Sequence, residues 1–307
     1  MKSEKSKHIS GLSGLTIACL LLVAAAAANA GETMPVAGQR VVLITGSTGG
    51  LGRETARALA LRGDHVIIHG RSEERGKSLL AEIEAAGKGS ARFYRADFGS
   101  LQEVRGLADS ILADYERLDV LLNNAGIFNP DQQERLVSED GYELHFQVNY
   151  LSGYVLTRML APLLEASAPS RVINVASGQR PIDFDNLMLE TGYDGRQAYF
   201  QSKNAQIMMT FALTDEFAAR GITINAMHPS DLMNTDMVIE AGFEPLTPVE
   251  TGRDALVRLV NEDVGTGKFF NVFEEDEAIP QAYDADAVAR LMAVSEELVS
   301  ADTAGSD

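Results

Sequence analysis

The sequence has one cysteine, Cys19, and no tryptophan among its 307 residues. A single cysteine near the N-terminus excludes an internal disulfide, a zinc site built from cysteines and a thiol nucleophile in the body of the chain. Basic residues are also scarce, 26 against 44 acidic ones, which gives a formal charge of -18 at pH 7. Such a balance repels phosphate backbones and anionic lipid. We therefore expect no nucleic-acid partner. Separately, we predict no metal site.

The remaining composition is ordinary for a globular protein, with 45% hydrophobic and 23% charged residues. It excludes a disordered, collagen-like or coiled-coil chain. A chain of this length can bury about three quarters of the surface that it exposes when unfolded. Length alone permits one large domain or two small ones.

The first thirty residues differ from the rest. Three lysines among the first seven residues precede an apolar run at 15–28, which ends in Ala28-Asn29-Ala30. A basic start, an apolar centre and a small-x-small end are typical of a secretory signal peptide. The run is shorter than the roughly 20 apolar residues that span a bilayer, which disfavours the alternative of an uncleaved anchor.

We therefore predict that residues 1–30 are a signal peptide and that the mature chain begins at Gly31. The protein would then be exported to a periplasm or a secretory lumen, without stable membrane contact after cleavage. Initiation at Met34 would instead give a cytoplasmic protein.

From Arg40 onward, short β-branched runs alternate with segments of helical periodicity. Continuous apolar runs are typical of parallel strands buried on both faces. Strict alternation predicts an α/β fold, a doubly wound Rossmann sheet of seven parallel strands in a single domain at 40–299, after a linker at 31–39 and before a flexible tail at 300–307. The predicted strands are 41–45, 65–69, 91–95, 119–123, 171–176, 222–228 and 268–273, and the predicted helices are 51–62, 73–86, 101–116, 141–165, 197–220, 250–261 and 284–299.

The strongest local signal is the glycine-rich turn TGSTGGLG at 45–52, between the first strand and the first helix. Glycines at such a turn let backbone N–H groups and the helix N-terminus approach a pyrophosphate. The candidate contacts are Gly46, Ser47, Gly50, Leu51 and Gly52.

The spacing TGxxxGxG, the sequence Asn123-Asn124-Ala125-Gly126 after the fourth strand and the sequence YFQSK at 199–203 together resemble the short-chain dehydrogenase/reductase superfamily in its single-domain form. The resemblance covers about residues 38–299. TGSTGGLGRETARALA, HGRSEERGK, DGYELHFQVNYLSGYVLT, RVINVAS and LMAVSEELVS resemble its retinol-dehydrogenase-like branch. The resemblance implies an enzyme that transfers hydride between a nicotinamide cofactor and a carbonyl or alcohol.

The same resemblance implies a catalytic tetrad of Asn149, Ser177, Tyr199 and Lys203. Tyr199 and Lys203 are four residues apart, so both project from one face of a helix. A nearby ammonium is expected to lower the pKa of the tyrosine, which would make Tyr199 a general acid or base near neutral pH. Ser177 would donate to the same oxygen, and Asn149 would bend its helix locally and hold a water that links Lys203 to solvent.

Cofactor choice depends on Arg71, at the end of the second strand. An arginine there suits the 2′-phosphate of NADP, whereas a carboxylate suits NAD. We therefore predict that NADPH is preferred, with NAD tolerated. The resemblance implies further cofactor contacts: Asp97, Phe98, Asn124, Ala125, Gly126, Tyr199, Lys203 and Thr235. Among them, Thr235 would contact the nicotinamide side and Lys203 would contact the ribose.

A departure from the family pattern follows the sixth strand, where Ser230 replaces the usual glycine after Pro229. This removes a residue that adopts positive φ freely. The next stretch, about 231–246, is rich in methionine and other apolar residues, and methionine adapts to several shapes. We expect it to form a substrate lid and the substrate to be a neutral, lipophilic carbonyl or alcohol.

Two other functions stay open from sequence: a nucleotide-sensing regulator without turnover, and a sugar-nucleotide epimerase or dehydratase on an extended relative of the fold. Regulators of this kind usually lack the tyrosine or the lysine, and both are present here. Epimerases have the spacing TGxxGxxG and a larger C-terminal region. A homodimer through the helices 141–165 and 197–220 is common in the superfamily and is also considered.

Overall fold

The strands of residues 32–304, which are the part of the chain that the structure describes, form one continuous sheet in this computed structural model. Their order is β3-β2-β1-β4-β5-β6-β7-β8, and every pair from β3 to β7 is parallel. The order reverses between β1 and β4, so the sheet is doubly wound as predicted. The strands are β1 (Val41–Ile44), β2 (His65–Gly70), β3 (Ser90–Arg95), β4 (Val120–Asn123), β5 (Ser170–Val175), β6 (Ile222–His228), β7 (Phe269–Asn271) and β8 (Glu274–Asp276).

Apolar, largely β-branched sequence explains the position of β1 at the centre of this sheet. The four side chains of β1 are completely buried, and the strand pairs with β2 on one side and β4 on the other. A strand covered on both faces has no polar face, which is why its sequence is a continuous apolar run rather than an alternation.

The sheet has eight strands, so the prediction of seven is wrong by one. The segment predicted as the last strand, 268–273, ends as β7 at Asn271 and turns at Val272, whose φ is +56°. The chain then returns as the antiparallel strand β8. All three residues of β8 are exposed and acidic, so no hydrophobic pattern marks the strand in the sequence. Acidic side chains on this edge also discourage pairing with another chain.

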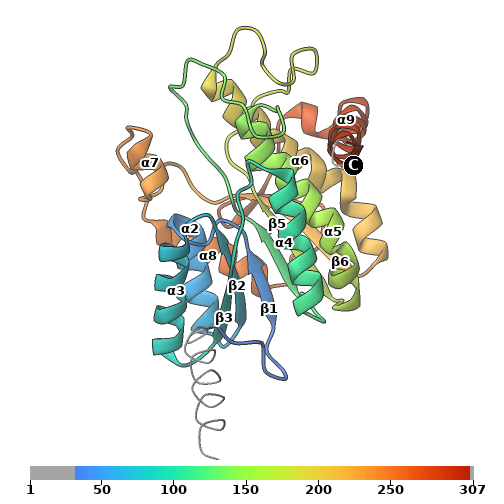
Figure 1. Cartoon of the computed structure of the whole chain (residues 1–307). Coiled ribbons are helices and arrows are strands. Elements are labelled where there is room, and N and C mark those ends of the chain that lie inside the picture. The colour runs from blue at the N-terminus through green and yellow to red at the C-terminus, as the bar shows by residue number, and fades with distance from the viewer. Residues whose placement is uncertain (1–31, 305–307) are drawn as a thin grey trace, which may run out of the picture.

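Helices cover both faces of the sheet (Figure 1). One apolar core lies between the sheet and α2, α3 and α8, and the other lies between the sheet and α4, α5, α6 and α9. The short helix α7 projects from the body of the molecule at the left of the view. The helices are α2 (Gly50–Ala60), α3 (Glu73–Ala86), α4 (Leu101–Asp114), α5 (Ser152–Ala166), α6 (Gly195–Ala219), α7 (Asp236–Glu240), α8 (Val249–Asn261) and α9 (Ala285–Ala304), with a 3-10 turn η2 at Pro280–Tyr283.

The helix predicted at 141–165 is distorted where Asn149 lies. Its first part is a π-helical segment, η1 (Phe146–Leu151), which passes directly into α5. A π-helical turn holds an extra residue, and such turns often lie at functional sites. The bend expected at Asn149 thus falls on a π-helical segment, a kind of irregularity at which helices often kink.

The C-terminal helix α9 packs against α6 and η1. Leu291 and Ser295 are completely buried, and Ser295 Oγ lies 2.7 Å from Tyr150 Oη. The helix continues to Ala304, into the segment predicted as a flexible tail, whose last three residues lie outside the described part. The helix therefore covers part of α6, one of the two helices considered for a homodimer.

The predicted signal peptide, residues 1–30, lies outside the described residues. Within residues 32–304, none of the helices has the length and apolar character required to cross a membrane.

Candidate active site

The glycine-rich turn joins β1 to α2 and brings backbone against backbone. Gly46 has φ +65°, and a Cβ on it would lie 2.8 Å from Cα of Ala125. A Cβ on Gly52 would lie 2.5 Å from the carbonyl oxygen of Gly46. No side chain caps the N-terminus of α2, and the first turn of this helix has no acidic residue. The turn therefore leaves helix N–H groups to bind an anion, as a pyrophosphate site requires.

Unlike the other predicted cofactor contacts, the Ser47 side chain does not line the cleft. It is completely buried, and its Oγ donates to Ile44 O at 2.8 Å and accepts from the backbone N–H of His69 at 3.0 Å. These bonds fix the turn to the sheet. Thr48, which the sequence analysis did not single out, lines the cleft instead.

A cleft of about 790 Å³ runs along the carboxyl ends of the strands. This is the usual ligand position in doubly wound sheets. Apart from Ser47, every residue predicted to contact the cofactor lines the cleft: Gly46, Gly50, Leu51, Gly52, Arg71, Asp97, Phe98, Asn124, Ala125, Gly126, Tyr199, Lys203 and Thr235.

His69 links the glycine turn to the residue that follows the edge strand β3. Its Nδ1 accepts from Gly46 N–H at 3.2 Å, so Nε2 carries the proton and donates to Ala96 O at 3.1 Å. The ring stacks on Phe98 with centroids 4.4 Å apart. Burial lowers the pKa of His69 to about 4, so the ring is neutral at neutral pH.

Arg71 lies at the end of the cleft beyond the glycine turn. Its guanidinium Nη1 lies 3.7 Å from the carboxylate of Asp97, and two thirds of its side chain is exposed. Arg75 also lines this end, and its Nη1 lies 3.5 Å from Asp236 Oδ2 on α7. Two arginines therefore border the part of the cleft where NADP-binding members of this fold hold a 2′-phosphate.

At the other end of the cleft, Tyr199 and Lys203 project from α6 as predicted, and Ser177 follows β5. Burial raises the pKa of Tyr199, and a hydrogen bond with Ser177 offsets only part of this increase. The expected lowering by Lys203 is therefore wrong for this structure. Lys203 Nζ lies 5.8 Å from the centre of the Tyr199 ring.

Lys203 is held by other partners. Nζ donates to Val175 O at 2.9 Å and to Gln206 Oε1 at 3.0 Å. Burial lowers the pKa of Lys203 to about 7, because an ammonium is costly to remove from water. Gln206 is not among the residues predicted from the sequence, although its spacing of three residues from Lys203 places both on one helix face.

Asn149 contacts the chain just after β4. Its Oδ1 accepts from Ile127 N–H at 2.8 Å, and its Nδ2 donates to Ile127 O at 3.2 Å and to Ser202 Oγ at 3.0 Å. A Cβ on Gly126 would lie 3.2 Å from Asn149 Oδ1 and 3.4 Å from Lys203 Nζ. The π-helical segment thus brings Asn149 beside Lys203, although the two are 54 positions apart in sequence.

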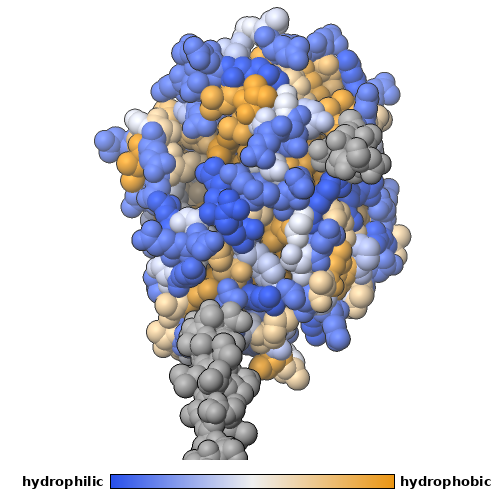
Figure 2. Space-filling view, viewed as in Figure 1, coloured by the Kyte–Doolittle hydropathy of each residue, from blue (hydrophilic) through white to orange (hydrophobic). Residues whose placement is uncertain are grey.

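Aromatic rings cover Tyr199. The Phe128 ring lies 4.5 Å from the Tyr199 ring, and Phe243, from the predicted lid, stacks on Phe128 at 5.9 Å with 21° between the planes. The lid also has exposed apolar side chains, Met237, Ile239 and Leu246. Figure 2 shows hydrophilic surface around this projecting segment, as expected from its acidic residues.

Ser230 adopts the conformation that the family glycine would allow, with φ +153°. A serine is strained there. Its hydroxyl donates to Thr247 Oγ1 at 3.1 Å, which ties the start of the lid to its end. Beside it, His228 lines the cleft and its Nε2 lies 3.2 Å from Asp231 Oδ1, a pairing that the sequence analysis did not identify.

The profile of the short chain dehydrogenase family matches residues 40–244. The chain therefore belongs to this family of oxidoreductases. Within the family it is a member of the retinol-dehydrogenase-like branch. It is 33% identical over 292 residues to retinol dehydrogenase 14 of Homo sapiens. This alignment covers 85% of this chain and 86% of that relative. It is 31% identical over 283 residues to human retinol dehydrogenase 13, with 85% and 84% covered.

Solved structures agree with this assignment. A protein from Mycobacterium paratuberculosis has a TM-score of 0.68 at 29% identity, covering 86% of this chain and 95% of that one. A short-chain dehydrogenase from Escherichia coli CFT073, solved in complex with NADPH, has a TM-score of 0.62 at 27% identity, covering 76% and 97%.

Proposed function

We propose that the protein is an NADP(H)-dependent oxidoreductase that transfers hydride between the nicotinamide and a neutral, lipophilic carbonyl or alcohol. The observation that carries the proposal is the arrangement of one cleft. An open helix N-terminus and Arg71 border one end, and the hydrogen-bonded Tyr199 and Ser177 lie at the other. The enzymes among its relatives favour this function over the regulator and epimerase alternatives.

The residues of the cleft fit a dinucleotide. Gly46 and Gly52 leave no room for a Cβ, and the uncapped helix above them suits the pyrophosphate. Arg71 would pair with the 2′-phosphate, and Asp97 would accept from the adenine amine. Lys203 would bond the ribose, and Thr235, which lies against Gly50, would contact the nicotinamide side. When bound, the cofactor supplies the hydride.

The protein's own residues then handle the substrate oxygen. Because burial raises the pKa of Tyr199, its hydroxyl keeps a proton near neutral pH and can donate it to a carbonyl oxygen. Ser177 would donate a second hydrogen bond to the same oxygen. Lys203, with a pKa of about 7, can hold or release a proton beside Tyr199. Phe128 and Phe243 would exclude water from this end of the cleft.

The test is oxidation of NADPH by a panel of aldehydes, followed by the loss of absorbance at 340 nm. Tyr199→Phe should lower the rate about 10²- to 10⁴-fold, as expected for a lost general acid, while NADPH affinity stays within about twofold. Turnover retained in this variant would refute the role of Tyr199. No turnover with any aldehyde or alcohol in the unmodified protein would refute the proposed reaction.

We also propose that residues 1–30 direct export and are removed. The support is the sequence pattern of basic start, apolar run and Ala28-Asn29-Ala30. Intact-mass analysis of the native protein should show Gly31 at the N-terminus in an extracytoplasmic fraction. A cytoplasmic protein that starts at Met1 or Met34 would contradict this.

A further inference from the structure

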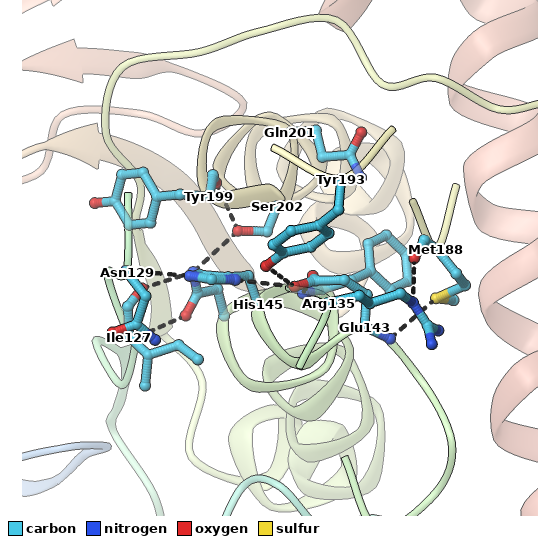
Figure 3. Close-up of polar contacts among 12 residues, drawn as sticks. Ile127, Asn129, Arg135, Glu143, His145, Met188, Tyr193, Tyr199, Gln201 and Ser202 are labelled. Atoms are coloured by element: carbon cyan, nitrogen blue, oxygen red, sulfur yellow. Dashed lines mark hydrogen bonds and ion pairs between the residues drawn. The ribbon is translucent and has the colours of Figure 1, made fainter. Parts of the chain in front are cut away.

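Glu143 and His145 form a completely buried polar pair that takes no part in the chemistry proposed above (Figure 3). Glu143 Oε1 accepts from His145 Nδ1 at 2.9 Å and from Tyr193 Oη at 3.1 Å. Glu143 Oε2 accepts from the backbone N–H of Phe146 at 2.7 Å. Three donors aimed at one carboxylate form a satisfied network, and such a network holds its members in one geometry.

The other side of the imidazole contacts the wall of the cleft. His145 Nε2 lies 3.2 Å from the backbone N–H of Asn129. This N–H can only donate, so Nε2 must accept and Nδ1 must carry the proton. Glu143 Oε1 accepts the hydrogen bond from this Nδ1–H and thereby fixes the tautomer and the orientation of the ring. The carboxylate thus acts on Asn129 through the histidine.

The segment held in this way, residues 127–129, is called here the substrate-side wall. Asn149 binds both backbone groups of Ile127 at one end of the wall, and His145 binds Asn129 at the other. Phe128 lies between these two anchors, with its ring against Tyr199 and Phe243. The two anchors of the wall therefore fix where the Phe128 ring lies against Tyr199.

The pair also contacts a second loop, the one that leads from Ser177 to α6. Tyr193 belongs to the segment 178–194, which joins Ser177 to α6, and its hydroxyl donates to Glu143. Arg135 Nε donates to Met188 O of the same segment at 2.6 Å. Figure 3 shows Glu143 between Tyr193 and His145, with Tyr199 beyond the histidine. One carboxylate thus connects the substrate-side wall with the segment 178–194.

We propose that Glu143 and His145 are positioning residues for the substrate, which act by holding the substrate-side wall against Tyr199. This inference rests on the proposed function. Because the glycine turn and Arg71, which would hold the phosphates of NADPH, line the other end of the cleft, the pair should affect the reaction with a carbonyl substrate far more than the affinity for NADPH.

Two amide substitutions at His145 test the roles of its two ring nitrogens separately. The amide of His145→Gln occupies about the position of Nε2 and can accept from Asn129 N–H. The shorter amide of His145→Asn occupies about the position of Nδ1 and can donate only to Glu143. If the histidine acts through Asn129, His145→Gln, which keeps that bond but loses the one to Glu143, lowers kcat/KM for an aldehyde about twofold, whereas His145→Asn lowers it at least about fivefold, the value of one hydrogen bond.

The NADPH dissociation constant should stay within about twofold in both variants, which also shows that each variant is folded. Equal losses in the two variants, a larger loss in His145→Gln, or a parallel loss of NADPH affinity would overturn the proposal. Tyr193→Phe is a milder second variant, because it removes one donor to Glu143 and leaves the bond to Asn129. It should cost less than His145→Asn, and a larger effect would also count against the proposal.

Hydrogen exchange gives a readout that does not depend on turnover. The Asn129 amide should be protected in the unmodified full-length protein and in His145→Gln, and should exchange at least about fivefold faster in His145→Asn. Equal exchange in all three proteins would refute the contact as a restraint on the wall. Protection without any aldehyde turnover would instead refute the proposed reaction and leave the wall restraint intact.

Discussion

Lys203 Nζ donates a hydrogen bond to Gln206 Oε1, 3.0 Å away, one helical turn along α6. Both residues are almost completely buried. The amide oxygen of Gln206 and the carbonyl of Val175 are the acceptors that offset part of the desolvation of the ammonium. Gln206 therefore helps to set the protonation state of the lysine beside Tyr199.

Replacement of this acceptor should change the pH dependence of the reaction. Gln206→Leu removes a partner of the charged form, so the pKa of Lys203 should fall further below about 7, and the loss of kcat/KM with rising pH should begin about one unit lower. Gln206→Glu should move this limb in the opposite direction. The measurement is kcat/KM from pH 5 to 10, and superimposable profiles for the two variants would contradict the prediction.

Arg71 should account for most of the preference for NADPH over NADH. A charge-assisted hydrogen bond to a phosphate contributes about 1.5–3 kcal/mol, so Arg71→Ala should weaken NADPH binding about 10- to 100-fold and leave NADH binding nearly unchanged. Fluorescence titration measures both affinities. Arg57→Ala is the matched control, because Arg57 is also exposed but contacts Glu54 outside the cleft. Equal affinities for the two cofactors in the unmodified protein would refute the assignment.

The lid should select substrates by apolar burial. Along a series of straight-chain aldehydes, kcat/KM should increase with each buried methylene, which contributes up to about 0.8 kcal/mol. Phe243→Ala removes the ring that stacks on Phe128 and should flatten this slope. Ile239→Ala, an exposed position of the same lid, is the control and should leave the slope unchanged. A flat series in the unmodified protein, or better activity with sugar phosphates, would show that the lid does not select in this way.

The protein should lose stability as the pH falls from about 6.5 to about 4. Burial lowers the pKa of His69 from 6.5 to about 4 in the folded state, so between these values the unfolded chain binds a proton that the folded chain excludes. His69→Asn should therefore lose about 2 kcal/mol less than the unmodified protein between pH 7 and pH 5. Urea unfolding at the two pH values measures this difference.

His65 provides an internal check on that result. Its pKa is also lowered to about 4, mainly by burial, and it lies away from the glycine turn beside Ser90 and Tyr115. Removal of both histidines should reduce the pH dependence further than removal of one. An unchanged pH dependence in the single and double variants would show that other groups control the acid sensitivity.

The sequence by itself determined the parallel strands, the doubly wound class and the glycine turn. These features depend on local pattern: apolar runs define buried strands, four glycines permit a close backbone approach, and a spacing of four places Tyr199 and Lys203 on one helix face. For the same reason α3 begins and ends at the predicted residues. The edge strand β8 escaped prediction because three exposed acidic residues form a strand only through pairing with β7.

Only the tertiary structure decided the environment of the site. The pKa of Tyr199 rises because burial depends on everything packed around the ring, whereas the spacing to Lys203 suggested a decrease. Ser47 faces the sheet because its hydroxyl meets the backbone of β2, 22 positions away in sequence. The contact of His145 with Asn129 likewise requires the start of η1 to pack beside the loop that follows β4. Desolvation and long-range hydrogen bonds arise only when distant segments come together, so no local pattern contains them.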